Sequence, residues 1–355
     1  MSGVSLRVDV DAWRRHLTTV ADATPGIVPV AKGNGYGFGL ARLAEESSRL
    51  GAGVLAVGLP SEVGLVRDDF AGDIVIMTPW RPDDDRARQL LADPRVITTV
   101  SRIEDLAAVA AAGASTRIEP RVIIEVLTSM RRHGIRPADL AGVAPHLDPV
   151  VVEGWTLHLP LSDEGRYTEA ERLSRAALDV AAAPLWISHL PPAEATTLAK
   201  QLGGAGSPPV PMRLRVGTRL WLGDPGSLCT TATVLDVHPV RRGDRAGYRR
   251  RRIRQDGWLL VIAGGTAHGV GMEAPTPASS GRQRLVALAG GGLEAAGWAL
   301  SPYTVAGKKR WFLEPPHMQA SLVLLPGSVP PPAVGEEVPV ELRLTTGLVD
   351  QMVPV

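Results

Sequence analysis

The sequence predicts a (β/α)8 barrel followed by a mainly β carboxyl-terminal domain. Between residues 26 and 216, eight β-branched runs alternate with segments whose apolar residues recur at three- and four-residue spacing, the pattern of strands joined by crossover helices. From about residue 228 the runs become short and alternating, and glycine- and proline-rich turns separate them. We therefore expect a barrel over residues 1–227 and a β domain over residues 228–355.

The expected barrel strands are nearly continuous apolar runs, which are typical of parallel strands buried on both faces. In chain order they are GIVPVAK, VLAVG, IVIMT, VITTV, RVIIEVL, GWTLHL, LWISHL and MRLRV. The expected helices are LARLAEESSRL, PSEVGLVRDDF, DDDRARQLL, SRIEDLAAVAAAG, TEAERLSRAALDVAAA and PAEATTLAKQL. A barrel of this kind collects its functional residues at the carboxyl ends of its strands. A doubly wound open sheet has the same periodicity and stays the alternative.

The second domain is expected to contain strands and no helix. Its predicted strands are TTATVLDVHPV, GWLLVIAG, QRLVALAG, ASLVLLP and EVPVELRLT.

Composition excludes several classes of protein. The 355 residues are 45% hydrophobic, enough for a large core, which excludes a disordered chain. The net charge of +1 argues against a nucleic-acid-binding protein, and the lack of an apolar run of roughly 18 residues argues against a membrane protein. The amino terminus lacks the apolar region of a signal peptide, and the single Cys229 fits a reducing cytoplasm. The scattered histidines indicate no metal site.

One of only four lysines, Lys32, ends the first expected barrel strand in the segment VPVAKGNGYGFG. A lysine at a barrel mouth is desolvated, which lowers its pKa and makes a neutral amine available for Schiff-base formation. The following glycines allow the backbone to approach a ligand closely. A glycine-rich loop with a solvated lysine is the alternative interpretation.

VPVAKGNGYGFG resembles the pyridoxal-phosphate lysine motif of alanine racemases, and the resemblance continues in order along the chain through TSMRRHGI, GWTLHL, LRVGTRLWLG and EPPHMQASLVLLP. It implies pyridoxal 5'-phosphate as cofactor and Lys32 as the Schiff-base residue. The cofactor-binding residues it implies are Lys32, Tyr36, His158, Ser188, Arg215, Gly217 and Thr218. The substrate-binding residues it implies are Arg132, Glu125, Met318 and Gln319, the last two reaching the partner's site in a head-to-tail homodimer.

The sequence departs from the family where the second base is expected. Alanine racemases carry a catalytic tyrosine in a Gly-Tyr-Ala-Asp-Gly segment, and the match here, VIAGGTAHGVG, places Thr266 at that position. A threonine hydroxyl is too weak an acid to replace a phenol, and His268 is the nearest group of suitable pKa. The other tyrosines offer no replacement, since Tyr248 is expected in a turn and Tyr167 and Tyr303 in exposed loops.

A second departure is Glu125, where many family members carry a carbamylated lysine. Glutamate is already anionic, so we expect it to support Arg132; a purely structural carboxylate is the alternative.

The resemblance implies racemisation of a small amino acid such as alanine by Cα proton transfer, possible supply of D-amino acids for cell-wall synthesis, and His268 of a partner subunit as second base. The alternative is a homologue that binds pyridoxal phosphate but catalyses a different reaction or none, because of Thr266. A third hypothesis is that the arginine run at residues 249–254 contacts phosphate groups. The sequence favours the alternative that these arginines lie on a solvated strand face. The sequence names neither the substrate nor an obligatory dimer.

Overall fold

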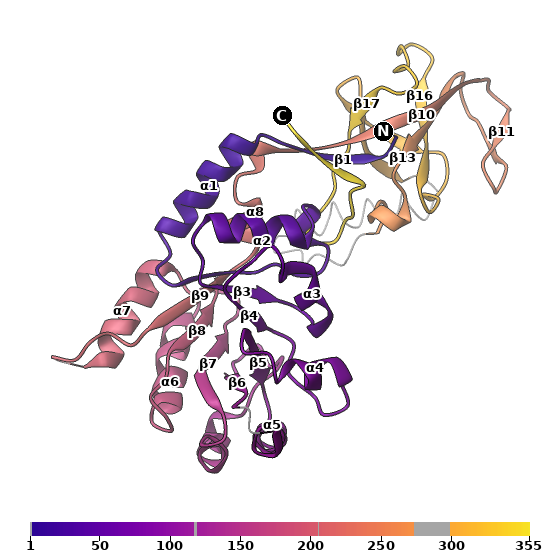
Figure 1. Ribbon diagram of the computed structural model, residues 1–355. Helices are drawn as coiled ribbons and strands as arrows, with labels where there is room; N and C mark the ends of the chain where they lie inside the picture. Colours follow the sequence, from indigo (N-terminus) through magenta and orange to yellow (C-terminus); the bar gives the residue numbers. More distant parts are fainter. Residues whose placement is uncertain (1, 117–118, 205, 273–298) are drawn as a thin grey trace. The chain divides into compact units, whose positions relative to one another are not determined.

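The computed structural model describes residues 2–116, 119–204, 206–272 and 299–355. The chain divides into two compact units (Figure 1). One unit is Arg14–Gly223, and the other combines Met1–Trp13 with Asp224–Val355.

The first unit is a barrel of parallel strands. Its strands lie in the order β2-β9-β8-β7-β6-β5-β4-β3. A parallel bridge between Val30 and Ala56, with the Ala31 amide donating to the Ala56 carbonyl at 2.8 Å, joins the two ends of this sheet. The predicted barrel is therefore confirmed, and the alternative of an open, doubly wound sheet is excluded. Its strands are β2 (Ile27–Pro29), β3 (Val54–Val57), β4 (Asp73–Ile76), β5 (Val96–Val100), β6 (Arg121–Val126), β7 (Val151–His158), β8 (Leu185–Ser188) and β9 (Met212–Val216).

Helices surround these strands in Figure 1, with their apolar faces toward the sheet. They are α2 (Leu40–Arg49), α3 (Val63–Val66), α4 (Asp85–Leu90), α5 (Ile103–Thr116), α6 (Arg166–Leu178), α7 (Pro192–Gly203) and α8 (Thr218–Leu222). A further helix, α1 (Val10–Asp22), runs across the division between the units. Local chemistry sets several helix starts; the Asp84 carboxylate, for example, accepts from the Ala87 amide at 2.9 Å before α4.

Three short 3-10 helices also lie in the barrel unit: η1 (Gly35–Gly37), η2 (Pro60–Glu62) and η3 (Pro137–His146). The connection from β6 to β7 contains only η3, in which Pro145 prevents a regular α-helix because proline has no amide hydrogen to donate.

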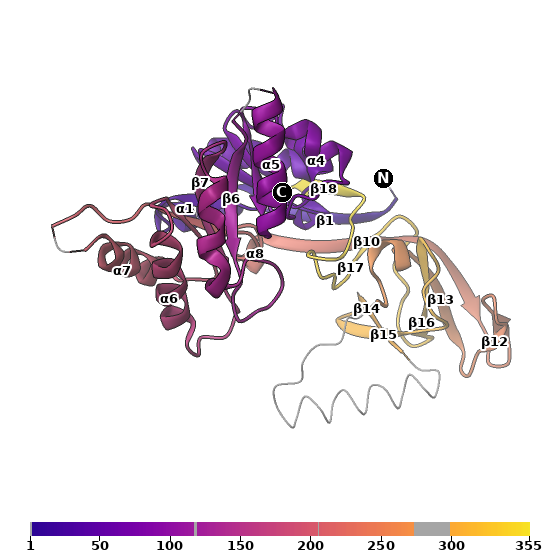
Figure 2. The ribbon, with the colours of Figure 1, turned by 90° about the horizontal axis from the view of Figure 1, so that it is seen from below.

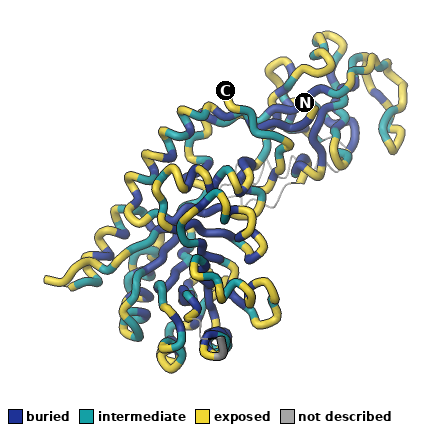
Figure 3. Tube along the Cα trace, in the orientation of Figure 1, coloured by how far each residue is buried: buried dark blue, intermediate teal, exposed yellow. Residues whose placement is uncertain are grey.

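The barrel interior is filled by strand side chains, and the strands appear as buried segments in Figure 3. Trp186 is the largest of these inward residues, and its indole donates to the Glu153 carbonyl at 2.9 Å. The interior group consists of Val28, Val30, Val54, Ala56, Val75, Ile97, Ile123 and Trp186. This packed interior leaves the strand ends as the place for chemistry.

The second unit is a mainly antiparallel sheet, seen from another side in Figure 2. Its strands lie in the order β14-β15-β16-β13-β10-β1-β18, and β17 pairs with β10. They are β1 (Val4–Val8), β10 (Leu228–Val240), β13 (Gly257–Ala263), β14 (Leu300–Val305), β15 (Lys308–Phe312), β16 (Ala320–Pro326), β17 (Glu337–Pro339) and β18 (Gln351–Pro354). A hairpin of β11 (Arg245–Ala246) and β12 (Arg251–Arg252) carries part of the arginine run, and two 3-10 turns, η4 (Pro225–Ser227) and η5 (Thr266–His268), complete this unit.

The structure differs from the sequence expectations at three points. Strand β1 belongs to the second sheet, whereas the sequence division assigned residues 1–227 to the barrel. The expected strand EVPVELRLT is reduced to β17, and beyond it Val340 forms only an isolated bridge with Tyr303. Of the two tyrosines expected in exposed loops, Tyr303 is fully buried in β14, and Tyr167 lies in α6 with its side chain partly buried. The expected strand QRLVALAG, residues 283–290, lies outside the described residues.

No helix in the described part of the chain combines the length and the apolar composition that a membrane crossing requires.

Candidate active site

Lys32 lies three residues beyond the end of β2, at the carboxyl end of the barrel strands. Desolvation within the barrel mouth lowers the pKa of its accessible amine, and the positive charges of Arg132 and Arg215 lower it further, while Glu62 raises it. A lowered pKa increases the fraction of neutral, nucleophilic amine near neutral pH. The environment of Lys32 is therefore suited to attack on a carbonyl carbon.

Glu62 fixes the loop that carries Lys32. Its buried carboxylate accepts from the Gly33 amide at 2.7 Å, the Gly58 amide at 2.6 Å and the Leu59 amide at 3.0 Å. These bonds tie the segment after β2 to the segment after β3. The sequence patterns do not single out Glu62, although a glutamate at the end of the first turn after a strand is a recognisable capping position.

Tyr36, Gly217 and Thr218 form a cradle at the same end of the barrel. The Tyr36 backbone is left-handed, with φ of 55°, and its amide donates to the Asn34 side chain at 3.0 Å. The buried Tyr36 hydroxyl hydrogen-bonds to Thr218, and a Cβ on Gly217 would lie 2.3 Å from that hydroxyl oxygen. Burial raises the Tyr36 pKa, so the hydroxyl stays protonated and can donate to an anion.

Three site residues occupy matching positions on adjacent strands. In the sheet register, His158 of β7 pairs with Ser188 of β8, and Ser188 pairs with Arg215 of β9. The ladder therefore places an imidazole, a hydroxyl and a guanidinium in a row, as expected for residues at the carboxyl ends of barrel strands.

Arg215 and Glu125 are both buried and interact electrostatically. Desolvation lowers the Arg215 pKa to about 10, and Glu125 opposes this shift. Desolvation likewise raises the Glu125 pKa, against the charges of Arg215 and Arg132. Arg215 Nη2 donates to the Leu157 carbonyl at 3.2 Å, but Arg215 Nε and Glu125 Oε2 have no partner among the described residues. The site thus presents one buried donor and one buried acceptor for a bound molecule.

His158 is neutral near pH 7. Desolvation, with the charges of Arg215 and Arg132, lowers its pKa to about 3. Its ring stands edge-on to His189, with the ring centroids 5.1 Å apart. His189, another residue that the sequence patterns do not single out, has φ of 65° directly after β8. An uncharged imidazole at this position offers an apolar face to a planar ligand.

These residues fit pyridoxal phosphate. The Tyr36 and Thr218 hydroxyls can donate hydrogen bonds to a phosphate group, and Gly217 has no side chain to obstruct it. Lys32 has an amine of lowered pKa that can attack an aldehyde. Arg215 has an Nε donor without a partner among the described residues, which can donate to a ring nitrogen.

The remaining expected site residues belong to the second unit. Thr266 and His268 lie in η5, and Met318 and Gln319 precede β16. Two bonds of 2.9 Å join the segments: the Ala267 amide donates to the Met318 carbonyl, and the Gly264 amide donates to the Gln319 carbonyl. Thr266, Met318 and Gln319 are exposed and therefore available to a neighbouring molecule.

His268 is held inside the second unit. Its Nε2 lies 3.1 Å from Asp350, and its Nδ1 accepts from the Gly265 amide at 3.3 Å. The ring is buried, with a side-chain exposure of 9%. Because the Gly265 amide donates to Nδ1, the proton of a neutral ring lies on Nε2 and points at the carboxylate.

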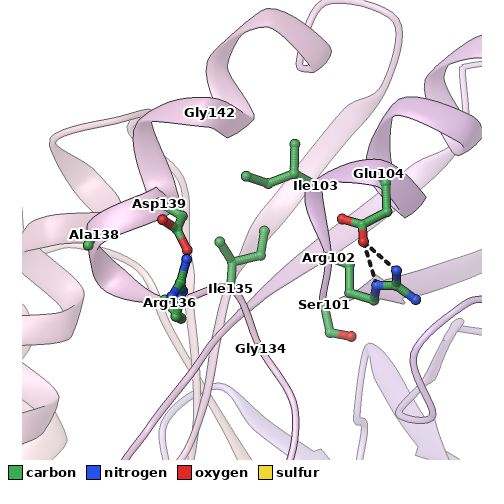
Figure 4. A pocket seen from close by; sticks show the side chains of 10 residues that line it. All are labelled: Ser101, Arg102, Ile103, Glu104, Gly134, Ile135, Arg136, Ala138, Asp139 and Gly142. Carbon is green, nitrogen blue, oxygen red and sulfur yellow. Dashed lines mark hydrogen bonds and ion pairs between the residues drawn. The ribbon is translucent and has the colours of Figure 1, made fainter.

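A separate hollow of about 500 Å³ lies between the segments that follow β5 and β6 (Figure 4). Arg102 is paired with Glu104 there, and Arg136 with Asp139. None of the expected site residues lines this hollow, and its charged side chains already have partners, so we do not assign it to the active site. Its lining residues are Ser101, Arg102, Ile103, Glu104, Gly134, Ile135, Arg136, Ala138, Asp139 and Gly142.

Comparison with known proteins agrees with this arrangement. Residues 8–197 match the family model "Alanine racemase, N-terminal domain". An alanine racemase of Desulfovibrio desulfuricans is 27% identical over 198 residues, 51% of this chain and 52% of that protein. The chain thus spans about half the length of that relative. An alanine racemase of Mycolicibacterium vanbaalenii is 27% identical over 288 residues, 74% of this chain and 72% of that protein.

Solved structures share the fold across nearly the whole chain. The alanine racemase from Bartonella henselae with covalently bound pyridoxal phosphate superposes with a TM-score of 0.70 at 17% identity, covering 96% of this chain and 91% of that one. The E. faecalis alanine racemase gives 0.66 at 19% identity, covering 96% and 88%. The family model covers more than half of the sequence, and the barrel with its β unit has the fold of these enzymes, so the chain belongs to the alanine racemase family.

Proposed function

We propose that the protein uses pyridoxal phosphate to racemise a small amino acid such as alanine, with Lys32 as the Schiff-base residue. The observation that carries this proposal is the juxtaposition of a pKa-depressed Lys32 with two buried groups that lack partners, Arg215 Nε and Glu125 Oε2. Family membership supports the reaction class, and the position of His158, Ser188 and Arg215 at the ends of adjacent strands supports the cofactor.

When bound, the cofactor supplies a conjugated ring that holds the electron pair left at Cα after a proton departs. Tyr36, Ser188, Gly217 and Thr218 would hold its phosphate through hydroxyl and backbone contacts, and the neutral His158 would pack against the ring.

Arg215 would face the pyridine nitrogen. An arginine keeps its proton near neutrality, so it does not protonate the ring, which remains a weak electron sink. A weak sink favours proton return to Cα over transamination.

Arg132 would bind the substrate carboxylate at the mouth, and Glu125 would support it electrostatically. Lys32 would accept or return the proton on one face of Cα. We further propose a cytoplasmic head-to-tail homodimer, in which Met318 and Gln319 of one copy approach the other copy's barrel, and a role in supplying D-amino acids for cell-wall synthesis.

Solvent deuterium incorporation tests the proposal. We expect the wild-type protein to show the visible absorbance of a lysine-bound cofactor and to exchange the Cα proton of L- and D-alanine with solvent. The Lys32→Ala protein should lose the absorbance band. Retention of the band in Lys32→Ala, or no exchange across a broad amino-acid panel, would contradict the proposal.

A second candidate function rests on Thr266, which cannot serve as a general base. A homologue that binds pyridoxal phosphate but catalyses another reaction, or none, would show the absorbance band without racemisation.

A further inference from the structure

Racemisation needs a proton carrier on each face of Cα, and Lys32 can serve only one face. The Thr266 hydroxyl is too weak an acid to serve the other. The nearby His268 is buried, and both of its ring nitrogens are engaged, by Asp350 and by the Gly265 amide. The η5 turn therefore holds two residues at the expected place, neither of which has a free basic group.

His317 lies against this turn. The Thr266 amide donates to the His317 carbonyl at 2.9 Å, and a Cβ on Gly265 would lie 2.0 Å from the same carbonyl. These contacts place the His317 backbone immediately beside Thr266 within the second unit. Met318, the next residue, is 71% exposed, so the segment reaches the surface at this point.

A buried carboxylate orients the His317 ring. His317 Nε2 lies 2.8 Å from Glu314 Oε1, and Glu314 is only 3% exposed. Glu314 also accepts from the Tyr248 amide at 2.9 Å and the Arg249 amide at 3.3 Å. Burial raises the Glu314 pKa, but the His317 contact and the two amides outweigh it and hold the pKa below its usual value. Glu314 is thus a fixed anion.

This pairing determines which nitrogen can act as a base. Because the carboxylate accepts from Nε2, the proton of a neutral His317 ring lies on Nε2, and Nδ1 carries the basic lone pair. The Glu314 charge would stabilise the imidazolium formed when Nδ1 takes a proton. The His317 side chain is 24% exposed, against 9% for His268, so it is the more accessible of the two rings.

Tyr248 extends the surface around His317. Its ring packs against the imidazole at a centroid distance of 4.3 Å, and its side chain is 84% exposed. Tyr248 and Met318 are both highly exposed, so the face of the second unit that carries His317 is accessible to another molecule.

We propose that His317, oriented by Glu314, is the catalytic proton carrier on the face of Cα opposite Lys32 and is contributed by a second copy of the chain. This inference rests on the proposed racemase function. In one direction, the neutral Lys32 amine takes the Cα proton and becomes an ammonium group, while a His317 imidazolium gives its Nδ1 proton to the opposite face of Cα and becomes neutral. The reverse direction exchanges the two roles, so atoms and charge balance.

The test compares His317→Gln with a matched control, His238→Gln, which alters an exposed histidine paired with Asp236 at 3.4 Å elsewhere on β10. We expect His317→Gln to keep the cofactor absorbance and one-face Cα exchange but to lose racemisation by about 100-fold or more, the usual scale for a general acid–base group. His238→Gln should racemise at the wild-type rate. Wild-type racemisation by His317→Gln would overturn the inference while leaving the proposed function intact; a wild-type protein without cofactor absorbance or Cα exchange would overturn both.

A mixing experiment separates catalysis from folding. Lys32→Ala and His317→Gln, each inactive alone, should regain activity when coexpressed, because a mixed dimer contains one site with both groups intact. Random pairing gives about a quarter of the wild-type sites. Mixed dimers that form but remain inactive would contradict the shared site.

Discussion

The hydroxyl oxygen of Tyr36 lies 2.3 Å from the point that a Cβ on Gly217 would occupy. No side chain larger than hydrogen therefore fits at residue 217 while Tyr36 keeps its hydrogen bond to Thr218. Because Tyr36 is buried, it cannot move aside without disturbing the loop that follows Lys32.

Gly217→Ala should consequently weaken pyridoxal phosphate binding. Displacing the Tyr36 hydroxyl removes one hydrogen bond to a charged group, a loss of about 1.5–3 kcal/mol, or about 10- to 100-fold in affinity. Titration of the absorbance band measures the affinity. Gly53→Ala is the matched control, because a Cβ there meets nothing within 4 Å. An equal loss of affinity in both variants would contradict a phosphate-binding role for Tyr36 and Gly217.

Glu62→Gln should destabilise the Lys32 loop and lower the Lys32 pKa further. The carboxylate accepts three amides, and an amide side chain would turn a donor toward at least one of them. We expect a loss of about 2 kcal/mol in the free energy of unfolding, measured by urea denaturation. The pH dependence of lysine acylation in the cofactor-free protein reports the pKa. Since Glu62 raises that pKa, its removal must shift the profile to lower pH, and a shift to higher pH would contradict the assignment.

The lowered pKa of His158 should make the free energy of unfolding decrease as the pH is lowered. Its pKa is about 3 in the folded protein and 6.5 in the reference state, so the unfolded chain binds the extra proton. Its contribution is fully present above pH 6.5 and is lost progressively as the pH falls toward 3. Between pH 7 and pH 5 we expect a loss of about 2 kcal/mol in the free energy of unfolding that His158→Gln lacks. Parallel wild-type and variant slopes over this range would exclude the effect.

His268→Gln should reduce stability rather than abolish racemisation. The substitution breaks a part-buried contact with Asp350, which also accepts from the Val4 amide at 2.7 Å. We expect a loss of about 1–3 kcal/mol in thermal or urea denaturation, with residual racemisation well above that of His317→Gln. If racemisation disappears while stability is unchanged, His268 is the second proton carrier, as the sequence alone suggested.

Much of the barrel could be predicted because its strands are apolar throughout. Lys32 and Ser188 stand shortly after or at the end of such strands, so sequence patterning locates them. Strand β1 was missed because nothing local indicates its pairing with β10, more than two hundred residues away. The burial of Tyr303 was also missed, because the segment around it has no local pattern that identifies it as a strand with one buried face.

The partners of the site residues could not be predicted for a related reason. Glu62 contacts the amides of two different loops, and Glu314 contacts amides more than sixty residues earlier in the chain. Such contacts arise only when distant segments fold together, and the residue types alone do not reveal them. Side-chain orientation similarly decides that His268 is engaged and His317 accessible, although both are histidines beside Thr266.

The position of β1 between β10 and β18 has a consequence for how the chain is made on the ribosome. The barrel, Arg14–Gly223, is complete well before the last strands are synthesised, whereas β1 must wait for β10 and then for β18, its parallel neighbour. Strand β1 would therefore leave the ribosome before the barrel and pair only after the barrel is made, with an apolar edge exposed in the interval. Chaperone occupancy on nascent chains should accordingly persist after the barrel has folded and end only when β18 emerges.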